Sequence, residues 1–598
     1  MKRLSPAFII FLILVPAIIT DITRVRSWTD TINADGYGYY AYLPCTFIYH
    51  SLDYKKIMEE EHKLRPGMDM DEVAYPFVLY NNDNTKLTDK YFVGVSVVLT
   101  PFFLLAFFLS YVFGFSLTGY SALFQEAVVV AALFYLFLGL YYLRKLLLEY
   151  KVPDRIIYFT LALVLYGTNL FYYATVEPSI SHVYSFGLVA VFLYYAKQSI
   201  NDTKLKNLLP AILLLGLLCV IRPTNLFIVL VIPFLAGSFQ QTKLFVIRTF
   251  NLRNIIVLLG AITLVLSIQL FKWHAETGQW YIWGYGGESF DFSKPHFTDT
   301  LFSYRKGWFL YTPLMLFTLI GSVPMLARKR NYFLLAILVL FFIITTYVFS
   351  SWWQWWYGGS FGMRVFVDFY AFYALLLAWV LTESKGTWTR RVMIAVPVLC
   401  LGLCIIQTIQ YNKFIISYDK MNKKKYWDIF LKTADRYGWV YDNPASKLVL
   451  FNSPMLFAGN KNANSSSAVS KAHLHSGAHQ VQVTPSAGQV TLFAFKASEI
   501  PDSAGETMFV TAWANMPDVN CDAAITTHIV SANGTISYTD THSLADEIAG
   551  NEWERIQYFG KPLPLINASD SIKVYVKCIT GSVLLDDVSI QFGKQRQD

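Results

Sequence analysis

The first residues able to carry out chemistry are an aspartate and a set of tyrosines near the N-terminus. Asp35 follows the first apolar stretch, and Tyr37, Tyr39, Tyr40 and Tyr42 come directly after it. A carboxylate held at a membrane surface can act as a general base and take a proton from an acceptor hydroxyl. A helix N-cap followed by an interfacial belt of tyrosines explains the same residues equally well.

Several basic residues near the ends of later apolar stretches have the charge needed to bind an anionic group at the membrane surface. They are Lys90, Arg222, Arg305, Lys306 and Arg364. Arg222 stands out because it interrupts two apolar runs, with Pro223 suited to opening the next helix. Arginine and lysine at the ends of membrane helices also commonly extend to lipid headgroups, and this simpler reading stays open for each of them.

Two further polar residues and a group of aromatic residues complete the candidates. Glu177 and His182 lie in a short segment between two apolar runs and can bind a polar ligand, although a lone histidine or glutamate in a short loop is more often structural. The tryptophans at 352, 353, 355 and 356 favour an interfacial belt. Stacking on a sugar remains the alternative for them.

The elements that position these residues are membrane helices. The 598 residues are 55% hydrophobic and 15% charged, with a mean hydropathy of +0.39. A spanning helix needs about 20 mostly apolar residues. Such runs predict about eleven spans, near 7–22, 121–143, 156–175, 179–196, 207–221, 226–240, 255–271, 308–327, 332–350, 365–382 and 392–411.

The orientation depends on the apolar stretch 92–113. If it lies along the interface without crossing, the loops assigned to the cytoplasm hold 16 basic residues and the opposite loops hold 6, leaving out the long first loop. This assignment places a first external loop at about 23–120 and gathers the candidate residues on the outside. Five lysines between 413 and 425 follow the last span on that same side and argue mildly against it.

From about residue 451 the pattern changes to short alternating segments, among them 480–483, 490–495 and 572–576. This period of two predicts strands half-buried in an antiparallel sheet, separated by turns at 485–488 and 533–534. We expect a β-sandwich at 451–598, joined by a connector at 412–450 to the membrane domain at 1–411. Cys521 and Cys578 fall in the sandwich, either as a disulfide or as two buried thiols.

Asp35 with its aromatic neighbours, together with the segment Thr88-Asp89-Lys90-Tyr91-Phe92 that opens an apolar run, resembles the GT-C superfamily of glycosyltransferases. The resemblance covers about the first 410 residues and also includes the long first loop and a C-terminal domain. Segments at 551–555 and 583–590 are similar to strands of carbohydrate-binding jelly rolls. The chain departs from the family at Gly36, where many members carry a glutamate, which leaves a possible divalent metal in doubt.

The resemblance implies an inverting glycosyltransferase of the bacterial cytoplasmic membrane, with its C-terminal domain extracytoplasmic. It would transfer a sugar from a polyprenyl-phosphate carrier to a glycan, lipid or protein acceptor. Asp35 matches the base, and Lys90, Glu177, His182, Arg222, Arg305, Lys306 and Arg364 are the candidates for binding the donor. We expect no nucleic-acid partner. No residue is assigned as a metal ligand, and a divalent metal stays open as a cofactor. The alternatives are a transporter or flippase of lipid-linked sugars and a glycan-binding scaffold.

Overall fold

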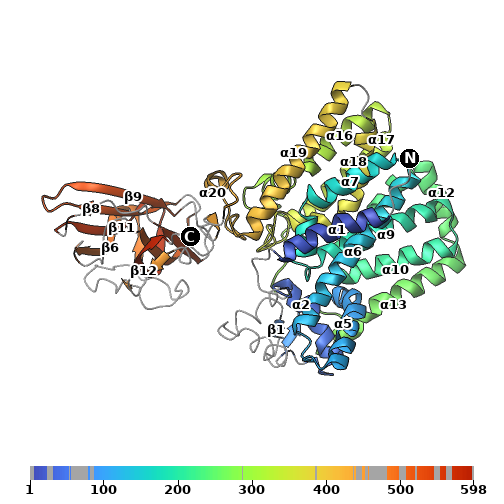
Figure 1. Cartoon of the computed structure of the whole chain (residues 1–598), viewed down its shortest axis with the longest axis horizontal. Helices are drawn as coiled ribbons and strands as arrows, with labels where there is room; N and C mark the ends of the chain where they lie inside the picture. The colour runs from blue at the N-terminus through green and yellow to red at the C-terminus, as the bar shows by residue number, and fades with distance from the viewer. Residues whose placement is uncertain are drawn as a thin grey trace. The chain divides into compact units, whose positions relative to one another are not determined.

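The computed structural model divides into two compact units, the membrane unit (Met1–Asn412) and the C-terminal unit (Lys413–Asp598) (Figure 1). The structure describes residues 6–22, 31–52, 54, 78–80, 87–285, 287–383, 387–434, 437–438, 448–450, 455–456, 481–496, 498, 507–518, 521–544, 553–559, 567 and 569–595. The two units are described separately.

The membrane unit is helical. Its helices are α1 (Pro6–Ile22), α2 (Asp35–Phe47), α5 (Gly94–Phe113), α6 (Ala122–Glu149), α7 (Asp154–Tyr166), α8 (Leu170–Thr175), α9 (His182–Asn201), α10 (Leu205–Ile221), α11 (Ile232–Ala236), α12 (Phe239–Thr249), α13 (Leu252–Thr277), α14 (Phe297–Phe302), α15 (Trp308–Tyr311), α16 (Pro313–Arg328), α17 (Tyr332–Ser350), α18 (Tyr370–Glu383) and α19 (Thr387–Asn412). The 3-10 helices η2 (Pro223–Val231) and η3 (Arg364–Phe369) precede α11 and α18, and strands β1 (Val78–Tyr80) and β2 (Leu87–Asp89) pair antiparallel.

Six helical segments among the described residues are long and apolar enough to cross a membrane, so the chain is a membrane protein. They are α5, α6, α13, α17, η3 with α18, and α19, and a seventh is counted if the bent pair of η2–α11 and α12 forms one span. The predicted count of about eleven spans is not confirmed. The helices α10 and α16 are apolar but only 17 and 16 residues long.

Breaks in helical continuity account for much of this difference. The predicted span 156–175 is divided between α7 and α8, with Gly167 directly after α7. The predicted span 308–327 is divided at Thr312, because Pro313 opens a new helix there. A count of apolar residues does not detect such interruptions, since the backbone can turn inside an apolar run when side chains or neighbouring helices satisfy its polar groups.

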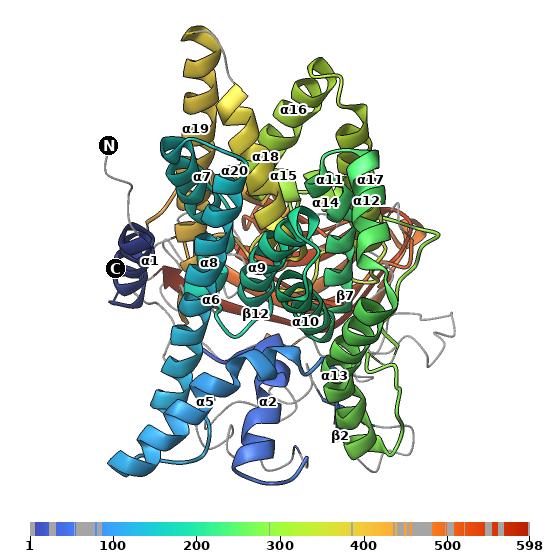
Figure 2. The same cartoon turned by 90° about the vertical axis from the view of Figure 1, so that its right-hand side faces the viewer.

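Helix α5 is one of the six possible spans by length and composition. The count of basic residues in the loops favours a placement of this stretch along the interface. In Figure 2, α5 runs obliquely to α6, and Phe102 of α5 packs against Phe134 and Tyr135 of α6. The interfacial placement of α5 therefore stays a prediction.

The two ends of the membrane helices differ in chemistry. Helices α9, α10 and η3–α18 begin or end at His182, Arg222 and Arg364, which meet at one end of the bundle, as shown below. Basic residues occupy the opposite ends of these elements: Lys197 donates to the carbonyl of Leu235, Lys204 precedes α10, and Lys329 pairs with Glu383 at 2.6 Å. The candidate site and these basic residues thus lie at opposite helix ends.

The C-terminal unit contains a β region with two sheets. Its elements are α20 (Lys423–Asp428), β3 (Leu448–Leu450), β4 (Met455–Leu456), β5 (Val481–Val483), η7 (Pro485–Ala487), β6 (Gln489–Lys496), β7 (Thr507–Asn515), β8 (Asp522–Val530), β9 (Ile536–Ser543), β10 (Glu554–Phe559), β11 (Ser571–Thr580) and β12 (Val583–Gln595). One sheet has the order β6-β11-β8-β9, and the other has β10-β7-β12-β3, with β4 and β5 also paired to β12.

Alternating apolar residues from both sheets meet in one core. Val574 and Ile525 from the first sheet join Val510 and Ile590 from the second, and all four are fully buried. The predicted turn at 533–534 connects the antiparallel strands β8 and β9. The turn at 485–488 is different, because β5 pairs with β12 and β6 with β11, so it links the two sheets and not two neighbouring strands.

Candidate active site

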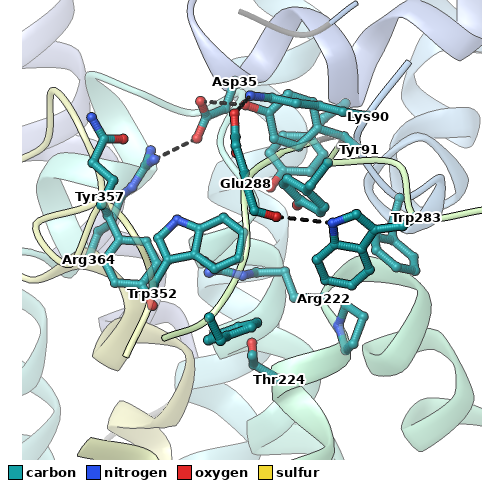
Figure 3. A pocket seen from close by; sticks show the side chains of 16 residues that line it. Asp35, Lys90, Tyr91, Arg222, Thr224, Trp283, Glu288, Trp352, Tyr357 and Arg364 are labelled. Atoms are coloured by element: carbon teal, nitrogen blue, oxygen red, sulfur yellow. Dashed lines mark hydrogen bonds and ion pairs between the residues drawn. The ribbon is translucent and has the colours of Figure 1, made fainter. Parts of the chain in front are cut away.

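A cavity of about 260 Å³ lies where distant segments of the membrane unit meet (Figure 3). Its walls come from the start of α2, the residues after β2, the junction of α10 with η2, and the loops that follow α13 and α17. Three cations, two carboxylates and eight aromatic residues line it: Lys90, Arg222 and Arg364; Asp35 and Glu288; and Tyr39, Tyr91, Phe92, Trp283, Tyr285, Phe290, Trp352 and Tyr357. Charged and aromatic groups together favour a polar ligand with flat faces.

Asp35 is the first residue of α2, and both of its carboxylate oxygens are bound. Oδ1 accepts a hydrogen bond of 2.7 Å from the Tyr91 hydroxyl, and Oδ2 lies 2.7 Å from Nη2 of Arg364. Burial disfavours the charged carboxylate, but Arg364, the Tyr91 hydroxyl and Lys90 outweigh it and lower the pKa of Asp35 below its usual value. Asp35 is therefore held as a carboxylate at neutral pH.

The backbone on either side of Asp35 is tightly constrained. Ala34 has a φ of +45°, a value that costs a residue with a Cβ and that often marks a functional position. Gly36 packs against Ser179, since a Cβ on Gly36 would lie 2.1 Å from the Ser179 hydroxyl oxygen. This contact gives a physical reason for glycine at position 36, because no side chain fits there.

Lys90 lies beside Asp35 and is paired with the second carboxylate of the cavity. Its Nζ is 2.8 Å from Oε1 of Glu288, and this ion pair is partly exposed. The backbone of Gly284 approaches the Lys90 carbonyl so closely that a Cβ on Gly284 would lie 2.9 Å from the carbonyl oxygen. The indole of Trp283 donates a hydrogen bond of 3.0 Å to the Glu288 carbonyl. The loop after α13 is thereby fixed against the segment that carries Lys90.

A buried polar cluster supports the segment from Asp89 to Tyr91 from behind. The backbone N–H of Tyr91 donates to the Asp89 carboxylate at 2.8 Å, and Lys272 donates to the Asp89 carbonyl at 2.9 Å. Lys272 also pairs with Glu276 one helical turn further along α13. Burial raises the pKa of Asp89 well above its usual value, although Lys272 opposes the shift. The cluster holds Lys90 and Tyr91 at the cavity.

Arg222 faces the cavity from a second buried cluster. Nη1 of Arg222 lies 3.8 Å from an Asp368 carboxylate oxygen and 3.2 Å from each ring nitrogen of His182. An atom equally close to both ring nitrogens lies against the ring and not along the axis of either nitrogen. His182 Nδ1 is itself 2.7 Å from the other Asp368 oxygen, and both side chains are only 1% exposed. Arg222 is 17% exposed and is the residue of this cluster that lines the cavity.

Aromatic residues from two loops form another wall. Phe290 and Trp352 pair through an antiparallel bridge, and their rings are 4.7 Å apart. Two backbone hydrogen bonds, from Trp353 to Ser289 at 3.0 Å and from Asp291 to Ser351 at 2.7 Å, extend the contact. The loops after α13 and α17 therefore form one surface, which presents flat rings to the cavity.

The structure brings together four of the eight predicted site residues. Asp35, Lys90, Arg222 and Arg364 line the cavity. Figure 3 shows Asp35, Lys90 and Glu288 along one side, with Arg222 and Thr224 across from them. The cavity thus has a side with two carboxylates and an opposite side with Arg222.

The other four predicted residues do not line the cavity. His182 lies behind Arg222, and Glu177 accepts a hydrogen bond of 3.0 Å from the buried Tyr172 hydroxyl. The Arg305 guanidinium stacks on Trp356, 3.7 Å from the ring centre, and Lys306 donates to the Ser360 carbonyl. The contacts of Arg305 and Lys306 hold the loop that leads to Arg364, so these two residues support the site from outside it.

Sequence reasoning did not select Glu288, Tyr91 or Asp368. Tyr91 lies in the segment 88–92 that carries the family resemblance, but nothing in the spacing of Tyr91 or Glu288 singled them out. Asp368 had a stronger signal, because it is an acidic residue inside the apolar stretch 365–382. Ionisable residues in such stretches commonly mark functional sites.

No protein-family model matches this sequence, and no match to a curated protein was found. Among solved structures, the chain is similar to the arabinosyltransferase EmbB from Mycobacterium smegmatis, with 11% identity and a TM-score of 0.35 over 99% of this chain and 66% of that one. It is also similar to an arabinose-bound MgGH51 α-L-arabinofuranosidase, with 14% identity and a TM-score of 0.16 over 25% of this chain and 24% of that one. Both TM-scores are too low to support a functional assignment.

Proposed function

We propose that this protein is a membrane-embedded inverting glycosyltransferase. It transfers a sugar from a polyprenyl-phosphate carrier to the hydroxyl of a glycan, lipid or protein acceptor. The observation that carries the proposal is the cavity with an ionised Asp35 on one side and Arg222 on the other. Displacement with inversion requires a base and a leaving-group site on opposite faces of the sugar, as in inverting glycosidases.

Asp35 is the general base in this mechanism. The acceptor oxygen forms a bond to the anomeric carbon, the bond from that carbon to the phosphate oxygen breaks, and the acceptor proton passes to a carboxylate oxygen of Asp35. Its lowered pKa keeps Asp35 ready to accept the proton but makes it a weak base. We therefore expect the proton to move late, when the bond between the anomeric carbon and the phosphate oxygen is already largely broken.

The leaving phosphate is stabilised by Arg222. Lys90 and Arg364 each have a carboxylate oxygen within 2.8 Å, whereas the carboxylate beside Arg222 is 3.8 Å away. Arg222 consequently has the most capacity to bind an added anion. Arg364 and Lys90 serve the opposite side, where they hold Asp35 and Glu288 in place.

The mechanism uses cationic side chains in place of a metal ion. Among the described residues, no group of three or more histidine, cysteine, aspartate or glutamate side chains is arranged to hold a metal. Asp35 is followed by Gly36 and so lacks an adjacent acidic partner. A divalent ion is not required by the steps proposed above.

The orientation follows from the two chemically different helix ends. The basic residues near Lys197, Lys204 and Lys329 favour the cytoplasmic side, which puts the cavity outside. We accordingly place the protein in the bacterial cytoplasmic membrane with an extracytoplasmic site and C-terminal domain. That domain is proposed to bind glycan.

Transfer by purified protein tests the proposal. The protein in lipid nanodiscs is supplied with a panel of polyprenyl-phosphate sugars and acceptors, and wild type is compared with Asp35→Asn and Arg222→Gln. Loss of an essential general base removes a factor of about 10²–10⁴ from the rate. We expect Asp35→Asn to lose at least this much and Arg222→Gln to weaken donor use.

Asp291→Asn is the matched control, because Asp291 is an exposed carboxylate of the same loop system that binds Ser293 and does not line the cavity. Unchanged transfer by Asp35→Asn would remove Asp35 as the base. Failure of wild type to transfer from any donor, combined with movement of a lipid-linked sugar across the membrane, would favour the transporter.

A further inference from the structure

The buried contact between His182 and Asp368 has no role in the mechanism described so far. Asp368 lies in η3 and His182 opens α9, and neither side chain lines the cavity. Burying a carboxylate costs free energy unless hydrogen bonds and a nearby opposite charge compensate for the loss of water. The adjacent charge here is Arg222.

We propose that His182 and Asp368 are positioning residues that control the orientation of Arg222 and how much of its charge is available to the donor phosphate. The inference rests on the proposed function. It gives His182 an indirect role, in place of the direct contact with the donor that the sequence suggests.

The two distances to Asp368 carry the argument. One carboxylate oxygen is 2.7 Å from His182, whereas the other is 3.8 Å from Arg222. His182 therefore holds Asp368 back from a close ion pair of the kind that Lys90 and Arg364 form with their carboxylates. Arg222 therefore lies beside a carboxylate without a close ion pair to it, which leaves more of its charge to a ligand.

The imidazole also fixes the direction in which Arg222 points. Because Nη1 lies 3.2 Å from both ring nitrogens of His182, the ring supports this end of the guanidinium. The Tyr173 ring in turn packs edge-on against His182, 5.4 Å away. A side chain held by a ring and a carboxylate loses little freedom when a ligand binds, which favours tight binding.

Two substitutions of His182 have different expected effects on phosphate affinity. With His182→Leu, Asp368 is free to move onto Arg222 and neutralise it, so phosphate affinity falls. With His182→Asn, the amide N–H can still donate to Asp368, so much of the affinity returns. Loss of a hydrogen-bonding partner behind a metal ligand typically reduces affinity by about 10–100-fold, and by analogy we expect about tenfold for His182→Leu.

Binding of farnesyl monophosphate to the full chain in nanodiscs provides the test, followed through the fluorescence of the cavity tryptophans Trp283 and Trp352. The expected order of affinity is wild type, then His182→Asn, then His182→Leu, with Arg222→Gln weakest. In the double variant of His182→Leu with Asp368→Asn, the competing carboxylate is gone, so the affinity should recover above that of His182→Leu alone. A purely structural role for the pair predicts further loss instead.

Thr318→Val is the control for loss of a buried polar group, because its hydroxyl bonds only within α16, to Leu314 at 2.8 Å. A variant that fails to fold is recognised by its thermal unfolding, and His182→Asn then carries the comparison. Equal affinity of wild type and His182→Leu would overturn the inference and leave the proposed function standing. Absence of binding by wild type would overturn both.

Discussion

Oδ2 of Asp35 and Nη2 of Arg364 are 2.7 Å apart, which joins the start of α2 to the start of η3 across the cavity wall. The Tyr91 hydroxyl completes the contact from a third segment. Three parts of the chain that are distant in sequence therefore fix one carboxylate. The protonation state of Asp35 is set by this contact, and it can be tested directly.

Replacement of Arg364 by glutamine should move the acid limb of the pH–rate profile upward. Arg364 is the largest of the groups that lower the pKa of Asp35, and burial, which raises it, would remain. Wild type should keep its rate as the pH falls to about 4, the usual pKa of an aspartate, because only the ionised form acts as a base. The measurement is kcat/KM between pH 3 and pH 8.

The same shift contributes to stability. A carboxylate with a depressed pKa in the folded state stabilises the protein above its unfolded pKa, and this contribution is lost as the pH falls through the folded value.

Lys329→Gln is the control for the pH–rate profile of Arg364→Gln, because it breaks a partly exposed ion pair with Glu383 at the opposite helix end. A profile for Arg364→Gln that overlays that of wild type would separate Arg364 from the protonation of Asp35.

Gly94→Ala should disrupt the packing of α5 against the end of α10, where Arg222 lies. A Cβ on Gly94 would lie 2.3 Å from the backbone nitrogen of Ile221, directly before Arg222. Backbone atoms cannot rotate away, so α5 and α10 must separate, and we expect a clear loss of thermal stability and of activity together.

Gly402→Ala is the matched control, because Gly402 lies within α19 and nothing surrounds its Cβ position within 4 Å. Alanine favours a helix by roughly 0.8–1.0 kcal/mol over glycine, so this change should be neutral or slightly stabilising. Thermal unfolding in the same detergent compares the two variants. Equal stability of both would show that α5 and α10 are not packed as closely as the structure has them.

Cysteine labelling should place the cavity and the basic helix ends on opposite sides of the membrane. With the native cysteines replaced, we expect Ser116→Cys and Asp291→Cys to react with an impermeant maleimide in intact cells. Lys204→Cys should react only after the cells are opened. External labelling of Lys204→Cys would reverse the orientation, and internal labelling of Ser116→Cys would show that α5 crosses the membrane.

Cys521 and Cys578 should form a disulfide if the C-terminal domain faces an oxidising compartment. Their sulfur atoms are 3.8 Å apart, and the residues lie 57 positions apart in sequence. By chain entropy, closing a loop of this length stabilises a fold by roughly 3–5 kcal/mol. Mass spectrometry after alkylation without a reductant measures the bond, with Cys400 and Cys404 of α19 as thiols expected to stay reduced. Two alkylated sandwich cysteines would argue for a reducing side.

The sequence best identified those site residues that lie at the ends of apolar runs. Asp35, Lys90, Arg222 and Arg364 were selected because a charged residue at such an end needs a polar environment, and these four line the cavity. Residues inside loops carry no such signal. Glu288 is distinguished only by its contact with Lys90, which is created by the fold of the whole membrane unit.

The helices show a similar division between what hydropathy reveals and what it misses. The stretch 332–350 was predicted as a span and is the continuous helix α17. The stretch 226–240 was also predicted as a span, but it contains parts of η2 and α11, and the chain bends by 117° before α12. Gly237, with a φ of +86°, permits that turn. Such a bend depends on one backbone angle, to which an average over many residues is insensitive.

The size of the cavity has a consequence for how reaction rates should be measured. At about 260 Å³ it lies just below the range of about 300–1,000 Å³ that is typical of sites for drug-sized ligands, so it has room for the sugar phosphate of the proposed donor but not for its long isoprenoid tail as well. The tail of the proposed donor would stay dissolved in the bilayer throughout the reaction. Saturation should then follow the mole fraction of donor among the lipids, and diluting the vesicles in buffer should leave the rate per enzyme unchanged.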